Sequence, residues 1–284
     1  MATIAENLER IQSAKTDIKT AIEAKGVTVP SSATIDTYAT YVSQISGGGG
    51  GSSSAETALK DLIERDITEI DIPSGATTIG SNAFQNCTSL ATCTIGSGVT
   101  SIGGDAFYNC TSLTNIEIPN SVTSIGESAF YACNGLTSCT IGSGVTDIST
   151  SAFQGCTSLT SIDIPNSVTS IGNSVFRDCS GLKNIDIPNS VTSIGYYAFQ
   201  YCTSLTSINI PSGVTTIGSN AFRYCVSLTN ITINATTPPT LTNANAFNNT
   251  NNCPIYVPAA SVDTYKSSNN WSSLASRIQA IPNS

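Results

Sequence analysis

The chain has 284 residues, of which 11 are basic and 19 acidic, and its formal net charge at pH 7 is −8. Between Asp66 and Pro258 there are 3 basic and 10 acidic residues, so most of the acidity lies in this central stretch. An acidic stretch repels phosphate backbones and anionic lipids, so we expect no nucleic-acid partner and no membrane partner.

Residues 1–46 are expected to form a small α-helical module for attachment or oligomerisation. Apolar residues follow four- and three-residue steps typical of a helical seam, namely Ile4, Leu8, Ile11, Ile18 and Ile22. A helical hairpin that buries its own seam is one interpretation. We favour a homo-oligomer, with a trimer as the weakly preferred form, because so few residues build an independent core poorly.

The first ten residues, MATIAENLER, lack the apolar segment of a signal peptide. We therefore expect synthesis in the cytoplasm without a signal peptide. Residues 47–54 form a Gly/Ser linker, and residues 55–66 an N-terminal cap helix. Ser53 and Glu56 have the spacing of a capping box before that helix.

Residues 67–234 contain a sequence repeat with a period of 23 residues. Phenylalanine marks the period at Phe84, Phe107, Phe130, Phe153, Phe176, Phe199 and Phe222. A cysteine follows each of these residues by three positions, and a leucine follows by six. A fixed period of this length predicts a repeat solenoid, in which each unit buries its apolar face against its neighbours.

One unit, residues 113–135, shows how the repeat is expected to fold. Ile116 and Ile118 point inward on a short strand, with Glu117 between them pointing outward. A second extended piece and then a short helical turn around Phe130 return the chain to the next unit. We expect the cysteine that follows, Cys133 in this unit, to be reduced and buried, although stacked cysteines could approach bridging distance.

The period slips in residues 235–284, which we interpret as a degenerate last repeat followed by a C-terminal cap. Ile255 and Val257 are expected on a last strand. Tyr265, Trp271 and Ile278 are expected on a helical cap.

The repeat unit I-x-I-P-x-S-V-T-S-I-G-x-x-A-F-x-x-C-x-S-L-T-x resembles the BspA-like, or Treponema-type, class of leucine-rich repeats. The ending CPIYVPAASVDTYK, residues 253–266, is similar to the closing segment of such arrays in gut bacteria. The resemblance implies a leucine-rich-repeat solenoid of short parallel strands and short helical turns. It also implies a role in adhesion and surface recognition.

Residues 14–30 and 37–45 are similar to segments of phage tail or fibre proteins. This resemblance implies a virion appendage that leaves the cell by lysis and contacts other virion proteins through residues 1–46. Our leading hypothesis is therefore a phage tail or head fibre that binds a host surface protein or glycan. The alternative is a bacterial cell-surface adhesin, and a carboxylate-based glycan hydrolase is third.

We expect no enzyme activity, no cofactor and no metal site. The chain has no histidine, which removes the usual partner of a nucleophilic serine, and it has no phosphate-binding loop. Asp163 and Asp186 fall on adjacent units of the outward strand column, with Glu117 two units earlier. A neighbouring carboxylate pair can raise a pKa or hold calcium, but a solvated polar face is the simpler interpretation.

The candidate ligand-binding patch combines tyrosine and arginine around the later phenylalanine turns. Its members are Tyr196, Tyr197, Tyr201, Tyr224, Arg177 and Arg223. Exposed tyrosine with arginine is typical of interaction hot spots. The alternative is that these tyrosines only cover the flank of the solenoid or pack between repeats.

Overall fold

A computed structural model describes residues 68–282 of the chain. The chain divides into two compact units, residues 1–63 and residues 64–284. The predicted helical module, the Gly/Ser linker and the cap helix, residues 1–66, lie outside the described residues.

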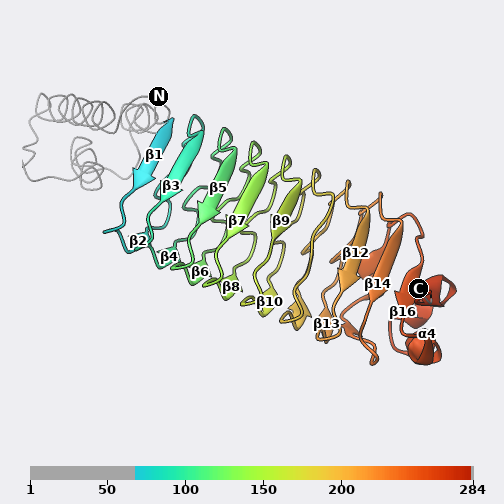
Figure 1. The fold of residues 1–284 in the computed structure, drawn as a ribbon. Coiled ribbons are helices and arrows are strands. Elements are labelled where there is room, and N and C mark those ends of the chain that lie inside the picture. The colour runs from blue at the N-terminus through green and yellow to red at the C-terminus, as the bar shows by residue number, and fades with distance from the viewer. Residues whose placement is uncertain (1–67, 283–284) are drawn as a thin grey trace, which may run out of the picture. The chain divides into compact units, whose positions relative to one another are not determined.

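The second unit is a solenoid built from two ladders of parallel strands (Figure 1). The strands of the first ladder are mostly four residues long, and their residues alternate between exposed and buried. They are β1 (Glu69–Ile72), β3 (Thr92–Ile95), β5 (Asn115–Ile118), β7 (Ser138–Ile141), β9 (Ser161–Asp163), β12 (Ser207–Ile210), β14 (Asn230–Ile233), β16 (Ile255–Val257) and β17 (Ile278–Ala280).

The second ladder consists of two-residue strands that pair into one sheet of 8 strands. They are β2 (Thr78–Ile79), β4 (Ser101–Ile102), β6 (Ser124–Ile125), β8 (Asp147–Ile148), β10 (Ser170–Ile171), β11 (Ser193–Ile194), β13 (Thr216–Ile217) and β15 (Thr240–Leu241). In β5, Ile116 and Ile118 are buried and Glu117 is exposed, as the alternation predicted. The prediction of a repeat solenoid is confirmed.

The segment around each phenylalanine, which leads the chain to the next unit, was predicted as a short helical turn. In the structure it is a series of hydrogen-bonded turns. Around Phe130, alternate backbone N–H groups donate to the next coil, with Phe130 N at 2.7 Å from Ala152 O. The intervening groups, such as Tyr131 N, donate within their own coil. An α-helix would use every N–H inside the segment, so the coil-to-coil bonds exclude it.

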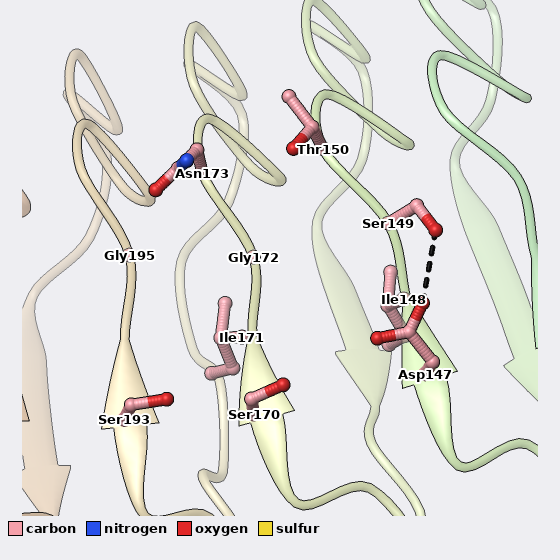
Figure 2. A pocket seen from close by; sticks show the side chains of 10 residues that line it. All are labelled: Asp147, Ile148, Ser149, Thr150, Ser170, Ile171, Gly172, Asn173, Ser193 and Gly195. Atoms are coloured by element: carbon pink, nitrogen blue, oxygen red, sulfur yellow. Dashed lines mark hydrogen bonds between the residues drawn. The ribbon is translucent and has the colours of Figure 1, made fainter.

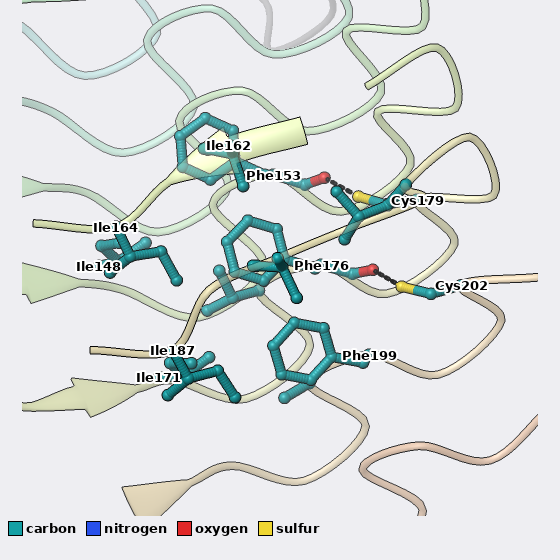
Figure 3. Packing of buried hydrophobic residues seen from close by; sticks show 14 of the residues in the cluster. Ile148, Phe153, Ile162, Ile164, Ile171, Phe176, Cys179, Ile187, Phe199 and Cys202 are labelled. Carbon is teal, nitrogen blue, oxygen red and sulfur yellow. Dashed lines mark hydrogen bonds between the residues drawn. The ribbon is translucent and has the colours of Figure 1, made fainter. Parts of the chain in front are cut away.

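The core is a set of like residues stacked along the solenoid. Neighbouring phenylalanine rings lie 5.1 to 5.8 Å apart between centroids. Figure 3 shows Phe153, Phe176 and Phe199 beside the isoleucines of both ladders. Columns of identical apolar residues account for the exact sequence period, because each side chain packs against its own copy in the adjacent coil.

The cysteine column lies inside this core and is hydrogen-bonded along it. Cys179 Sγ donates to Phe153 O and Cys202 Sγ donates to Phe176 O, each across 3.1 Å (Figure 3). Burial raises the pKa of the Cys133 thiol from 9.0 to about 12. The cysteines that are buried and unbridged, as expected, include Cys93, Cys110, Cys133, Cys139, Cys156, Cys179, Cys202, Cys225 and Cys253.

The C-terminal end closes the solenoid with short helices and one more strand. The helices are η1 (Ala244–Phe247), η2 (Ala259–Ser261), α4 (Val262–Ser267) and η3 (Ser272–Arg277). Trp271 is buried, and its Nε1 donates to Pro239 O at 2.7 Å. The placement of Ile278 in a helical cap was wrong, because Ile278 begins β17 and pairs in parallel with Ile255. No helix within residues 68–282 is long and apolar enough to cross a membrane.

Candidate functional site

The predicted patch lies on the phenylalanine turns of three successive coils, and we name it the Tyr–Arg edge. It comprises Tyr196, Tyr197, Tyr201, Tyr224, Arg177 and Arg223. Tyr196, Tyr197 and Tyr201 are 46%, 38% and 37% exposed, and within the described residues the other exposed large hydrophobic side chain is Val226. The edge therefore presents aromatic surface that the core does not cover.

Three tyrosines of the edge have a left-handed backbone. Two positions in every repeat have positive φ, the residue two before each column phenylalanine and the residue two after it. These positions hold Asn82, Asn86, Asp105, Asn109, Ser128, Ala132, Ser151, Gly155, Ser174, Asp178, Tyr197, Tyr201, Asn220 and Tyr224. The φ angles of the three tyrosines are 59°, 63° and 64°.

This conformation suits glycine, asparagine and aspartate, and it is a true outlier for a bulky side chain. Earlier coils use Asn, Asp, Ser, Ala or Gly at these two positions. Residues held in such conformations cost on the order of 1–3 kcal/mol each and concentrate at functional sites. The tyrosines thus occupy positions where the fold alone favours smaller residues.

Aromatic stacking and arginine contacts join Tyr201, Tyr224 and Arg223 in one group and Arg177 with Tyr197 in another. The rings of Tyr201 and Tyr224 are 4.7 Å apart and nearly parallel, at 2°. Arg223 Cζ lies 4.8 Å from the centroid of the Tyr224 ring, and its Nη2 donates to the tyrosine hydroxyl at 3.3 Å. Arg177 Cζ lies 5.9 Å from the Tyr197 centroid, so it connects the preceding coil to the edge.

Positive charge in the acidic repeat array is concentrated at this edge. Of the 3 basic residues between Asp66 and Pro258, two are Arg177 and Arg223, and the third is Lys183. Arg177 Nε lies 3.4 Å from Asp178 Oδ2, and both side chains are about 40% exposed, so solvent weakens this ion pair. Tyrosine and arginine together are enriched at binding hot spots.

The acidic strand column is only partly brought together. Asp163 and Asp186 are directly opposite each other on adjacent coils, joined by an isolated parallel bridge. Glu117 pairs with Thr140, which in turn pairs with Asp163, so a threonine separates it from the other two carboxylates. Within residues 68–282, no group of three potential ligands from His, Cys, Asp and Glu could hold a metal ion.

The thiols of the core are poor nucleophiles because burial raises their pKa, to about 12 for Cys93. None of the carboxylates within residues 68–282 is buried, whereas the hydroxyl-bearing residues Thr250, Ser261 and Tyr265 are. The geometry therefore offers a long surface for contact with another molecule, with one edge that carries aromatic and cationic side chains.

Residues 63–183 and 146–272 match the family described as BspA type leucine rich repeat region. The chain belongs to this family. The BspA-type match covers the whole described solenoid up to η3 and confirms the repeat class predicted from the sequence. The resemblance of residues 1–46 to phage proteins is not supported by any comparison.

Two solved bacterial structures have the same repeat architecture. A leucine rich cell surface protein of Faecalibacterium prausnitzii is 32% identical, with a TM-score of 0.57, over 69% of this chain and 64% of that one. A leucine-rich repeat protein of Bacteroides ovatus is 27% identical, with a TM-score of 0.53, over 76% of this chain and 67% of that one. This BspA-type chain thus spans less than two thirds of the F. prausnitzii structure. No curated protein matches the sequence.

Proposed function

We propose that this chain is a non-enzymatic recognition protein of the bacterial cell-surface adhesion type. Its Tyr–Arg edge binds a surface protein or glycan on another cell or on a matrix. The proposal is supported by membership of the BspA-type family and by the likeness to a cell surface protein of F. prausnitzii. Recognition fits a solenoid better than catalysis does, because its exposed faces are long and repetitive.

The observation that carries the proposal is the left-handed backbone of Tyr197, Tyr201 and Tyr224. A bulky residue at such a position costs stability. Stacking and cation–π contacts offset part of that loss of stability, but these contacts do not require an exposed ring. Tyr197 and Tyr201 are nevertheless exposed, with Tyr224 half-buried beside them, and exposed tyrosine near two arginines favours a binding role.

The virion-appendage hypothesis rests on residues 1–46, which lie outside the described residues, and the comparisons support the adhesin alternative better. Self-association through residues 1–46 stays a prediction. Light scattering of the chain with and without residues 1–50 tests it, and an unchanged oligomeric state after truncation would contradict it.

An attachment assay with a matched control tests the proposed function. The test variant carries Tyr197→Asn and Tyr224→Asn, because asparagine occupies equivalent positions in other coils, such as Asn109. The control is Tyr108→Asn, which removes a tyrosine that stacks at 4.8 Å but has an ordinary backbone away from the edge. Fluorescent protein is incubated with gut epithelial cells, mucin and bacterial cells.

We expect attachment of the double variant to fall at least tenfold, because loss of a single hot-spot residue costs about 2 kcal/mol and about 1.4 kcal/mol is a factor of ten. The control should attach like the unmodified chain. Equal attachment by all three proteins would contradict a role for the Tyr–Arg edge.

A further inference from the structure

Within the second ladder the pairing is weakest between β8 and β10. Their pairing is reduced to Ile171 with Ile148, whereas β10 and β11 pair over both residues. Gly195 N donates to Ile171 O at 2.8 Å, and this bond has no counterpart from Gly172 in the described ladder. The rings of Phe153 and Phe176 are 5.8 Å apart, the widest spacing between neighbouring phenylalanines of the column.

Two residues beside this junction, Ser149 and Val175, depart from the repeat. In the other regular coils a glycine follows the two-residue strand directly, as at Gly126 and Gly195. Ser149 occupies this position after β8. A Cβ on Gly195 would approach the neighbouring backbone to 2.6 Å, so coils with normal spacing have no room for one. Val175 replaces the alanine that precedes the phenylalanine in the other coils. The Cβ of Ser149 points toward the preceding coil, that of β6, and Val175 adds two carbon atoms to the coil of β10 itself.

A shallow groove of about 360 Å³ lies at this junction, across β8, β10 and β11 (Figure 2). Gly172 and Gly195 line the groove, and because they have no side chain, their backbone atoms are accessible within it. Its polar side chains come from three successive coils, and they are Asp147, Ser149, Thr150, Ser170, Asn173 and Ser193. Figure 2 shows Asp147, Ser170 and Ser193 in a row along one side, with Thr150 and Asn173 along the other.

The groove carries one carboxylate, and a serine of the same coil bonds to it. Ser149 Oγ donates to Asp147 Oδ2 at 2.9 Å. The position of Asp147 holds serine or threonine in the other coils, as in Ser124 and Ser170. The two residues that break the repeat at this coil, Asp147 and Ser149, therefore contact each other inside the groove.

An exposed aromatic residue follows the lining residue Gly195 in the chain. Tyr196 follows Gly195 directly, is 46% exposed, and its backbone N–H donates to Asn173 Oδ1 at 2.8 Å. A polar groove with an exposed aromatic ring beside it has the chemistry that recognises sugars. The hydroxyls of a sugar bond to carboxylate, amide and hydroxyl groups, and its C–H face packs on the ring.

We propose that this groove, with Asp147 as its main acceptor and Tyr196 bonded through its backbone to the lining residue Asn173, binds a neutral glycan chain. Neutral sugars are favoured because Asp147 has no cation within the groove, and its charge repels sulfated or carboxylated glycans. Regularly paired strands such as β10 and β11 are spaced by about 4.8 Å, close to the length of one pyranose, so successive sugars can meet Ser170 and Ser193. The inference rests on the proposed recognition function and names a ligand class for it.

Isothermal titration calorimetry of the full chain tests the groove. The probes are cellohexaose, maltohexaose and mannohexaose, with a heparin hexasaccharide as the acidic comparator. The test variant is Asp147→Ser, which restores the residue of neighbouring coils, as at Ser124 and Ser170. The control variant is Glu117→Thr, which removes one carboxylate from the other ladder. Threonine is the residue at the equivalent position of the neighbouring coils, Thr94 and Thr140.

We expect a neutral hexasaccharide to bind, and Asp147→Ser to weaken it about tenfold, because a hydrogen bond to a charged group is lost. Glu117→Thr should keep the unmodified affinity. The inference is overturned if no neutral probe binds at millimolar concentration, if Asp147→Ser binds equally well, or if heparin binds better. Cell attachment that persists without any hexasaccharide binding would overturn the groove alone and leave the proposed function standing.

Discussion

The left-handed tyrosines allow a stability prediction with an internal control. The chain has two stacked tyrosine pairs of nearly identical geometry. Tyr201 and Tyr224 stack at 4.7 Å with a left-handed backbone, and Tyr108 and Tyr131 stack at 4.8 Å with an ordinary one. Replacing one tyrosine of each pair by asparagine removes the same stacking contact in both cases. The two substituted positions differ in their backbone conformation.

The expected change follows from two opposing effects. In Tyr108→Asn the stacking is lost, which costs about 1 kcal/mol of the free energy of unfolding. In Tyr201→Asn the same loss is offset by about 1 kcal/mol, because asparagine tolerates positive φ and tyrosine does not. We therefore expect Tyr201→Asn to be close to neutral and Tyr108→Asn to destabilise the chain by about 1 kcal/mol.

Urea unfolding followed by far-UV circular dichroism measures both variants against the unmodified chain. A constant slope with urea is required for the comparison, because a changed slope means a changed unfolded or native state. Equal losses for Tyr108→Asn and Tyr201→Asn would refute the reasoning. That result would mean that the left-handed tyrosine costs nothing and that its rarity among the repeats has another cause.

Two further predictions concern the core. Burial raises the pKa of Cys93 and Cys133 from 9.0 to about 12. The free energy of unfolding should therefore be constant below pH 9 and fall between pH 9 and 12, where unfolded thiols ionise first. The urea midpoint of unfolding, measured across this pH range, tests the expected fall in stability. Alkylation of the native protein at pH 8 checks that the thiols are unreactive. A midpoint that does not change with pH would contradict the prediction. Gly195→Ala should cost about 1–3 kcal/mol, because its Cβ would lie 2.6 Å from the Gly172 backbone. Gly80→Ala, with nothing within 4 Å of its Cβ, should be near neutral, and similar melting temperatures for the two would refute the clash.

Much of the fold was readable from side-chain periodicity. The alternation around Glu117 predicted a strand with one face buried, and the structure has that pattern in β5. The spacing of the phenylalanines predicted stacked rings, and the rings stack at 5.1 to 5.8 Å. The Tyr–Arg edge was also named from the sequence, because exposed tyrosine and arginine depart from the repeat.

Other features could not be predicted from the sequence because they depend on contacts with the neighbouring coil. The segment around Phe130 has helix-like spacing of apolar residues, yet its alternate N–H groups bond to the next coil and not within a helix. Ile278 fitted a helical cap by spacing, but the free edge of β16 recruits it into β17. Asp147 and Ser149 deviate visibly from the repeat, but only the structure shows that the pairing of their coil with the next is reduced.

By itself the sequence determined which residues face the core and how often the chain turns, because a strict period of 23 residues allows each column to pack only on its own copies. Tertiary structure decided the backbone conformation of Tyr197, Tyr201 and Tyr224 and the groove beside Asp147. Backbone dihedrals and the spacing of coils result from hydrogen bonds and contacts between adjacent coils, and those partners lie about 23 residues away along the chain.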